Sequence, residues 1–137
     1  MTSATSAHTA TSSLDRSTFL RRVLFVDAAT CAATGALMSA ASAPLASLLG
    51  LPAALLFWSG LALFPVAAFM LFVATRRHVP VVDAWIAILG NAGWVVGSAL
   101  VLVLCAPSAL GYAFVIAQAA AVALLAELEY AGLKRLG

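Results

Sequence analysis

Three polar side chains interrupt runs of apolar residues that contain almost no other charge: Asp27, Asn91 and Gln118. A carboxyl group in apolar surroundings can take up and release a proton, and amide groups beside it can donate and accept hydrogen bonds. With about 1.5 Å of rise per helical residue, Asp27 lies about 7 Å, Asn91 about 12 Å and Gln118 about 16 Å from the polar ends of their runs. The sequence therefore predicts one internal polar track in a membrane.

Two further side chains extend this site along the face of Asn91. Trp94 and Ser98 follow it at helical spacings of three and four, and they offer an indole N–H and a hydroxyl group. Glu129 lies three turns beyond Gln118 and nearly in line with it, although its place near the end of the run also fits a solvated helix end. The candidate intramembrane polar site comprises Asp27, Asn91, Trp94, Ser98, Gln118 and Glu129.

A purely structural interpretation competes with a functional one at each position. Amide and hydroxyl groups commonly join helices inside membranes, where such hydrogen bonds contribute about 0.6 kcal/mol on average. Asp27 could pair with a basic side chain that reaches down from the interface, for which the candidates are Arg22, Arg77 and Lys134. Proton exchange and structural ion pairing both remain open for Asp27.

Other chemistries lack the residues that they require. Both histidines, His8 and His78, lie outside the apolar runs, so they are not placed to hold a haem between helices. The two cysteines, Cys31 and Cys105, are predicted at different depths and should not form a disulfide. The sequence also contains no CxxC, HExxH or phosphate-loop motif. We expect no enzyme activity, no catalytic residue, no metal, no cofactor and no nucleic-acid partner.

The elements that must position these groups follow from composition. Of 137 residues, 64% are apolar and 9% are charged, with a mean hydropathy of +1.10. Four runs reach the roughly 20 residues that a helix needs to cross a bilayer, and they do not alternate as barrel strands would. The sequence predicts an all-α membrane protein, a four-transmembrane-helix antiparallel bundle over residues 18–137. The expected helices cover about 19–43, 53–75, 83–105 and 109–132, after a disordered cytoplasmic tail over 1–17.

Basic residues predict how this bundle lies in the membrane. All seven Lys and Arg residues precede the first run, follow the last one or lie between the second and third. Both chain termini should therefore be cytoplasmic, in a multi-pass protein of the cell inner membrane. A cleavable signal peptide is the alternative for the first run, because "ASA" at 41–43 imitates a cleavage site, but Pro44 would obstruct cleavage.

Small residues predict close helix packing. Gly93 and Gly97 in "GWVVG" have the spacing at which a second helix can approach closely, either in the same bundle or in a partner. The connection "PLASLLG" is expected to form a short interfacial helix that ends at Gly50, and Pro52 fits the first turn of the next helix. The expected partners are the lipid bilayer and a second copy of the chain or another membrane protein.

The stretches "FVDAATCAATGALM", "LLGLP", "LGNAGWVVGSALVL" and "FVIAQAAAVALLAELEY" together resemble small bacterial four-helix inner-membrane proteins without an assigned activity. The chain is also similar to small multidrug-resistance transporters, since Asp27 and Trp94 correspond to acidic and aromatic positions of that family. It departs from them in having Asp for Glu and a one-sided charge distribution. The expected function is a non-enzymatic interaction or accessory membrane subunit, and the alternative is a small proton-coupled transporter that uses Asp27.

Overall fold

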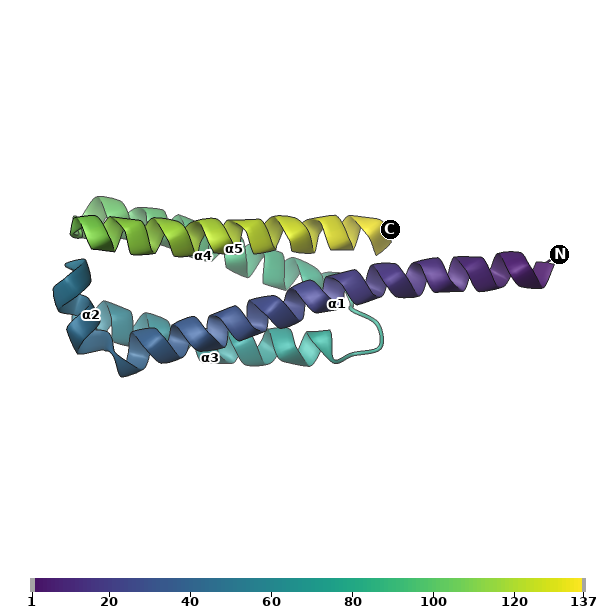
Figure 1. Ribbon diagram of the computed structural model, residues 1–137, viewed down its shortest axis with the longest axis horizontal. Coiled ribbons are helices and arrows are strands. Elements are labelled where there is room, and N and C mark those ends of the chain that lie inside the picture. The colour runs from purple at the N-terminus through teal and green to yellow at the C-terminus, as the bar shows by residue number, and fades with distance from the viewer. Residues whose placement is uncertain (1, 137) are drawn as a thin grey trace.

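The protein is entirely helical over the residues that the structure describes. The computed structural model describes the backbone of residues 2–136 and the side chains of residues 18–135. It contains α1 (Thr2–Ala40), α2 (Ser42–Leu49), α3 (Ala53–Ala74), α4 (Val81–Cys105) and α5 (Ala109–Leu136) (Figure 1). All but the short α2 contain a stretch that is long and apolar enough to cross a membrane. The prediction of a multi-pass, all-helical protein is confirmed at this level.

The helix ends follow from residues with restricted or unusual backbone conformations. Pro52 and Pro80 have φ angles of −61° and cap the N-termini of α3 and α4, so Pro52 lies one residue before the predicted first turn. The predicted interfacial helix is α2, which ends at Gly50 in a left-handed conformation with φ 66°. Ala106 ends α4 in the same region with φ 44°, which is uncommon for a residue with a Cβ atom.

Several predicted boundaries shift by a few residues. The first apolar helix ends at Ala40 rather than at 43, because the chain turns at Ala41 into α2. Helix α4 begins at Val81, two residues before the expected start, and α5 continues four residues past 132. Helix α1 begins at Thr2, and the disordered tail predicted for 1–17 lies outside the residues whose side chains are described.

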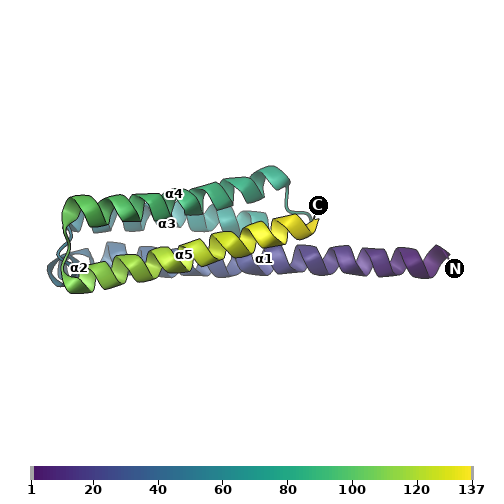
Figure 2. The ribbon, with the colours of Figure 1, turned by 90° about the horizontal axis from the view of Figure 1, so that it is seen from above.

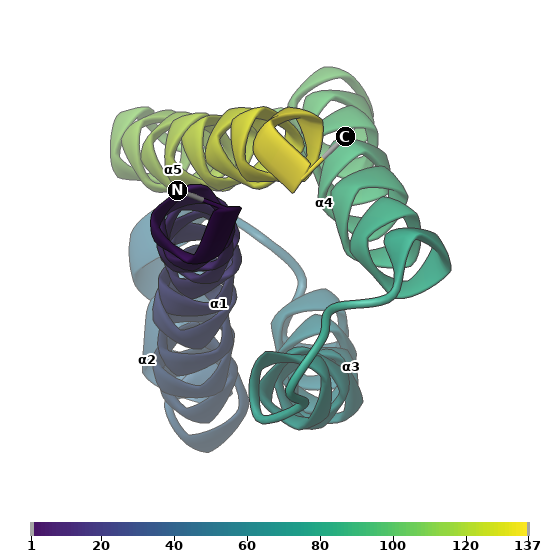
Figure 3. The same ribbon diagram turned by 90° about the vertical axis from the view of Figure 1, so that its right-hand side faces the viewer.

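The long helices form two pairs. Helix α1 packs most extensively against α3, and α4 packs against α5, while a contact between α1 and α5 joins the pairs (Figure 3). Both chain termini lie at one end of the bundle, and α2 lies at the other end beside the turn between α4 and α5 (Figure 2). We call these the terminal end and the α2 end.

At the α2 end, backbone contacts tie the two turns together. The Ser108 N–H donates a hydrogen bond to Leu49 O at 3.0 Å, and the Ser108 hydroxyl donates to Leu48 O at 2.8 Å. Gly111 lies so close to Leu49 O that a side chain at this position would collide with it. The α2 end is therefore held by direct contacts between segments far apart in the sequence.

Close helix packing occurs at glycines other than those predicted. A Cβ atom on Gly35 of α1 would lie 2.7 Å from Gly60 O of α3, so these two helices meet at their backbones. A Cβ atom on Gly93 or Gly97 would meet nothing within 4 Å in the described chain. The packing predicted for Gly93 and Gly97 within the bundle is therefore wrong, and their packing against a partner stays a prediction.

The outer surface of the bundle is apolar, as a lipid-facing surface must be. Large exposed side chains include Trp58, Leu89, Val103 and Leu104. In the most apolar window of each span, 39% of α1 but only 22% of α4 and 17% of α5 is buried inside the protein. Helices α4 and α5 therefore present most of their surface to lipid or to a partner.

Candidate functional site

Two carboxyl groups and one amide meet in the interior of the bundle, each from a different helix. Asn91 Nδ2 of α4 donates hydrogen bonds to Asp27 Oδ2 of α1 at 2.6 Å and to Glu129 Oε2 of α5 at 3.1 Å. Asp27 and Glu129 are 0% exposed and Asn91 is 4% exposed. We call these three residues the carboxyl cluster. One amide nitrogen thus uses both of its N–H groups to hold two carboxyl groups side by side.

Two further features complete the surroundings of this cluster. The thiol of Cys31, one helical turn after Asp27, lies 3.5 Å from Asp27 Oδ1 in a donor position. Glu129 Oε1 is buried and has no hydrogen-bond partner among the described side chains. A buried carboxyl oxygen without a partner is unusual, so it marks a place where a proton or another donor would be stabilised.

No basic side chain among residues 18–135 forms a salt bridge with the carboxyl cluster. Arg22, Arg77 and Lys134, the candidates for an ion pair with Asp27, are exposed, and Lys134 instead lies over the Tyr130 ring. The described salt bridge is the peripheral one between Arg76 and Asp83, at 3.5 Å. The structural ion pair considered for Asp27 is therefore not formed in this structure.

Without a basic partner among the described side chains, this arrangement is electrostatically demanding. Burial of one charge away from water is costly, and two like charges that share one neutral donor also repel each other. A bound proton or a bound cation would remove part of that cost. The cluster is thus chemically suited to the reversible binding of a small positive species.

A second polar group lies one turn further along α4. Trp94 Nε1 donates a hydrogen bond to Gln118 Oε1 at 2.7 Å, and Gln118 Nε2 donates to Ser98 Oγ at 3.1 Å. The Ser98 hydroxyl donates in turn to Trp94 O at 2.8 Å. We call Trp94, Ser98 and Gln118 the indole–amide group. It joins α4 to α5 through a closed set of hydrogen bonds.

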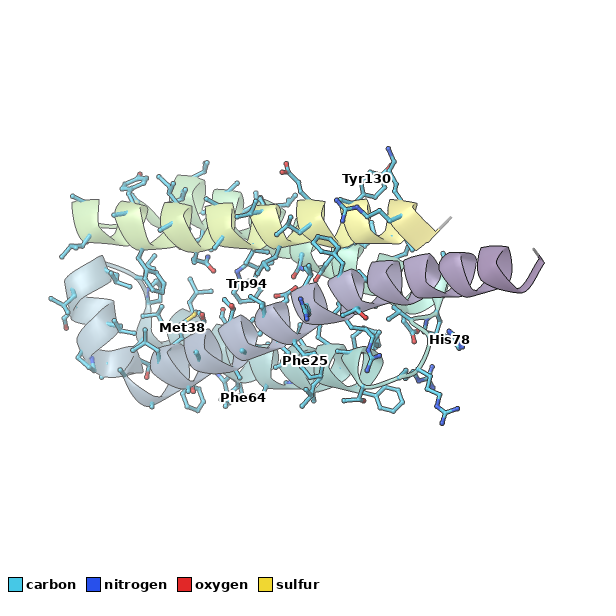
Figure 4. The ribbon with its side chains drawn as sticks, turned by 45° about the vertical axis from the view of Figure 1, so that its right-hand side comes forward. Phe25, Met38, Phe64, His78, Trp94 and Tyr130 are labelled. Carbon is cyan, nitrogen blue, oxygen red and sulfur yellow. The ribbon has the colours of Figure 1, made fainter. Side chains whose placement is uncertain are left out.

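Two cavities adjoin these groups. A cavity of about 390 Å³ reaches from Cys31 and Asn91 to Gln118, on the α2 side of the carboxyl cluster. We call it the terminal-end cavity, because it is the nearer of the two to that end. A cavity of about 400 Å³, the α2-end cavity, extends from Gln118 toward Leu51 and Leu55 beside α2. Trp94, Phe114 and Gln118 line both cavities. Figure 4 shows Trp94 between α5 and α1, and it shows His78 at the periphery in the loop before α4.

All six predicted site residues contribute to these two groups, but they do not form a single track. Asp27, Asn91 and Glu129 make one group, whereas Trp94, Ser98 and Gln118 make the other. The interpretation of Glu129 as a solvated helix end is wrong, because its side chain is fully buried. Cys31 and Phe114 were not among the predicted site residues, although the spacing of four between Asp27 and Cys31 indicates a shared face.

Fold and site together define an all-helical protein with four potential membrane-spanning helices and an interior polar site. Comparison with known proteins identifies no matching family model, no matching curated protein and no matching solved structure. Among residues 18–135, no group of three or more His, Cys, Asp or Glu side chains is arranged to hold a metal ion.

Proposed function

We propose that the protein is a small proton-coupled transporter of the bacterial inner membrane. The observation that carries this proposal is the carboxyl cluster, in which two fully buried carboxyl groups share the amide nitrogen of Asn91 beside a cavity. Asp27 was the expected proton-binding residue, and Glu129 joins it as a second one. A structural hydrogen bond between helices needs only one acceptor, so a second buried acid favours function.

In this proposal the two carboxyl groups hold one proton between them. Loss of that proton to water in the terminal-end cavity leaves an additional buried negative charge, which favours entry of a positive species or renewed protonation. Asn91 keeps both carboxyl groups oriented in either state, because its two N–H groups donate to a neutral and to a charged acceptor, with the stronger bond to the charged one. We place the exchanged proton on Glu129 Oε1, the buried carboxyl oxygen that accepts no hydrogen bond from the described residues.

The proposed setting is an antiparallel bundle with both termini in the cytoplasm. Both termini lie at the terminal end, and the loop with Arg76 and Arg77 lies near the same end (Figure 1). Because cytoplasmic segments carry the excess of Lys and Arg, this distribution supports a cytoplasmic terminal end. The carboxyl cluster then lies between the terminal-end cavity and the cytoplasmic side, and the buried side chains of Leu20, Leu24 and Val73 separate it from that side.

The test compares acid-to-amide variants in proteoliposomes with an imposed pH gradient and a broad panel of candidate substrates. Asp27→Asn and Glu129→Gln should abolish gradient-driven uptake. Glu127→Gln is the matched control, because Glu127 is exposed on the same helix and lies two residues from Glu129. Equal transport by the wild type and Asp27→Asn across the panel would show that no coupling occurs at this site.

A second candidate function is that of an interaction or accessory subunit that associates with another copy of itself. The supporting observation is that Gly93 and Gly97 meet no helix in the described chain, which leaves their close-approach spacing unused. Val96, which is 61% exposed on the same helix, provides a position for a cross-linkable cysteine. Val96→Cys should form disulfide-linked dimers in native membranes, and recovery of monomer alone would count against this function.

A further inference from the structure

The two cavities meet at a wall made of a few side chains. Trp94 and Phe114 supply its aromatic part and Gln118 its polar part, since these three residues line both cavities. The terminal-end cavity contains the amide of the carboxyl cluster, whereas the α2-end cavity contains none of the cluster's residues. A molecule that passes from the α2-end cavity into the terminal-end cavity must therefore cross this wall.

Hydrogen bonds hold the wall closed. Gln118 uses both ends of its amide, accepting from Trp94 Nε1 and donating to Ser98 Oγ, and Ser98 is bonded back to Trp94 O. A buried indole N–H that loses its acceptor is destabilised, so the indole ring is favoured in the closed position. The Trp94 side chain is half-buried and lines both cavities, so space lies on each side into which the ring can move.

We propose that Trp94 and Gln118 form the barrier that controls passage between the α2-end cavity and the carboxyl cluster. The proposal rests on the transporter function proposed above and adds the residues that determine access to its site. Trp94 blocks the path with its ring, and Gln118 is a positioning residue that holds the ring in place. Phe114 extends the aromatic wall, so passage favours molecules with an apolar surface.

Thiol accessibility tests the barrier without any need for a known substrate. In a background that lacks both native cysteines, Thr34→Cys reports on the terminal-end cavity and Ser59→Cys on the α2-end cavity. A membrane-impermeant thiol reagent is added to sealed vesicles from the α2 side, defined as the side from which Ser47→Cys reacts. With Trp94 and Gln118 intact, Ser59→Cys should react and Thr34→Cys should not.

Two variants should open the barrier. Trp94→Ala removes the ring, so the cysteine at position 34 should react from the α2 side at a rate close to that at position 59. Gln118→Leu leaves the ring in place and removes only the acceptor of the Trp94 N–H. Loss of a hydrogen bond of ordinary strength should raise the reaction rate of the cysteine at position 34 about threefold to thirtyfold. Trp58→Ala is the matched control, because Trp58 is 67% exposed on the outer surface and lines neither cavity.

Two results for the cysteine at position 34 would overturn the barrier. One is reaction of the cysteine at position 34 from the α2 side with Trp94 and Gln118 intact. The other is unchanged protection in both Trp94→Ala and Gln118→Leu while the cysteine at position 59 reacts normally. Either result leaves the transport assay of Asp27→Asn as a separate measurement, so failure of the barrier and failure of proton coupling are distinguishable. Lack of reaction at position 59 in every variant would equally overturn the proposal, because the α2-end cavity would then be closed to water.

Discussion

Replacement of Asn91 by leucine tests whether the carboxyl cluster depends on the amide that holds it together. Leucine has a similar size but no hydrogen-bond donor, so Asn91→Leu removes the bonds of 2.6 Å to Asp27 and 3.1 Å to Glu129. Glu129 Oε1 already has no partner, so neither oxygen of this carboxyl group would then have a donor among the described residues. The substitution therefore leaves a buried acidic group unsatisfied rather than merely deleting a contact.

The magnitude follows from the charge of the two acceptors. A hydrogen bond between neutral groups in a membrane contributes about 0.6 to 1.7 kcal/mol, and a bond to a charged group contributes about 1.5 to 3 kcal/mol. With one proton shared by the two carboxyl groups, one bond of each kind is lost. We expect Asn91→Leu to lower the free energy of unfolding by about 2 to 5 kcal/mol.

The assay is unfolding in mixed micelles with an increasing fraction of sodium dodecyl sulfate, followed by circular dichroism. Thr75→Val is the control, because the exposed Thr75 hydroxyl donates only to Phe72 O within its own helix end. That substitution should change the free energy by about 0.5 kcal/mol or less. In an Asp27→Asn, Glu129→Gln background, Asn91→Leu should cost less, because no charged acceptor remains. A cost for Asn91→Leu no larger than that for Thr75→Val would refute the reasoning.

Three further predictions concern packing, topology and surface charge. Gly60→Ala should destabilise the protein by about 1 to 3 kcal/mol in the same unfolding assay, because the added Cβ atom would lie 2.8 Å from Ser39 N. Gly93→Ala is the control: its Cβ atom would meet nothing within 4 Å, so the substitution should be neutral or slightly stabilising. In a cysteine-free background, Ser47→Cys should react with an impermeant thiol reagent in intact cells with a leaky outer membrane, and His78→Cys should react only after the inner membrane is opened. Labelling at position 78 in intact cells would reverse the proposed orientation. Asp83→Asn should change the free energy of unfolding by less than about 1 kcal/mol, because its salt bridge with Arg76 is peripheral and partly exposed to solvent. A larger loss of stability would show that this salt bridge is not a weak surface interaction.

The candidate membrane-spanning helices were largely predictable, because each depends on properties local to a segment. Four apolar runs became four long apolar helices, and the short "PLASLLG" segment became α2 with Gly50 at its end. The errors at helix ends arise where local signals compete. The apolar run continues through Ala41, for instance, although the backbone turns there into α2.

The candidate site was predictable as a set of residues but not as an arrangement. Helical spacing places Asn91, Trp94 and Ser98 on one face of α4, and the structure keeps them there. The spacing does not say which partner each of them meets across the bundle. In the structure, Asn91 donates hydrogen bonds to Asp27 and Glu129, whereas Trp94 donates to Gln118.

The sequence by itself determined that the chain is apolar enough for a lipid environment and that its fold is all-helical. It also determined the positions of the polar side chains along each helix. These follow from hydropathy and from the period of the α-helix, which need no knowledge of neighbours. Only the tertiary structure decided that Glu129 is buried beside Asp27 and that the six candidate residues form two groups. It also decided that the close helix contact occurs at Gly35 and Gly60 and not at Gly93 and Gly97. The physical reason is that rotation and sliding of one helix against another depend on shape complementarity between surfaces far apart in the chain. Periodicity along one helix contains no information about the surface of the next.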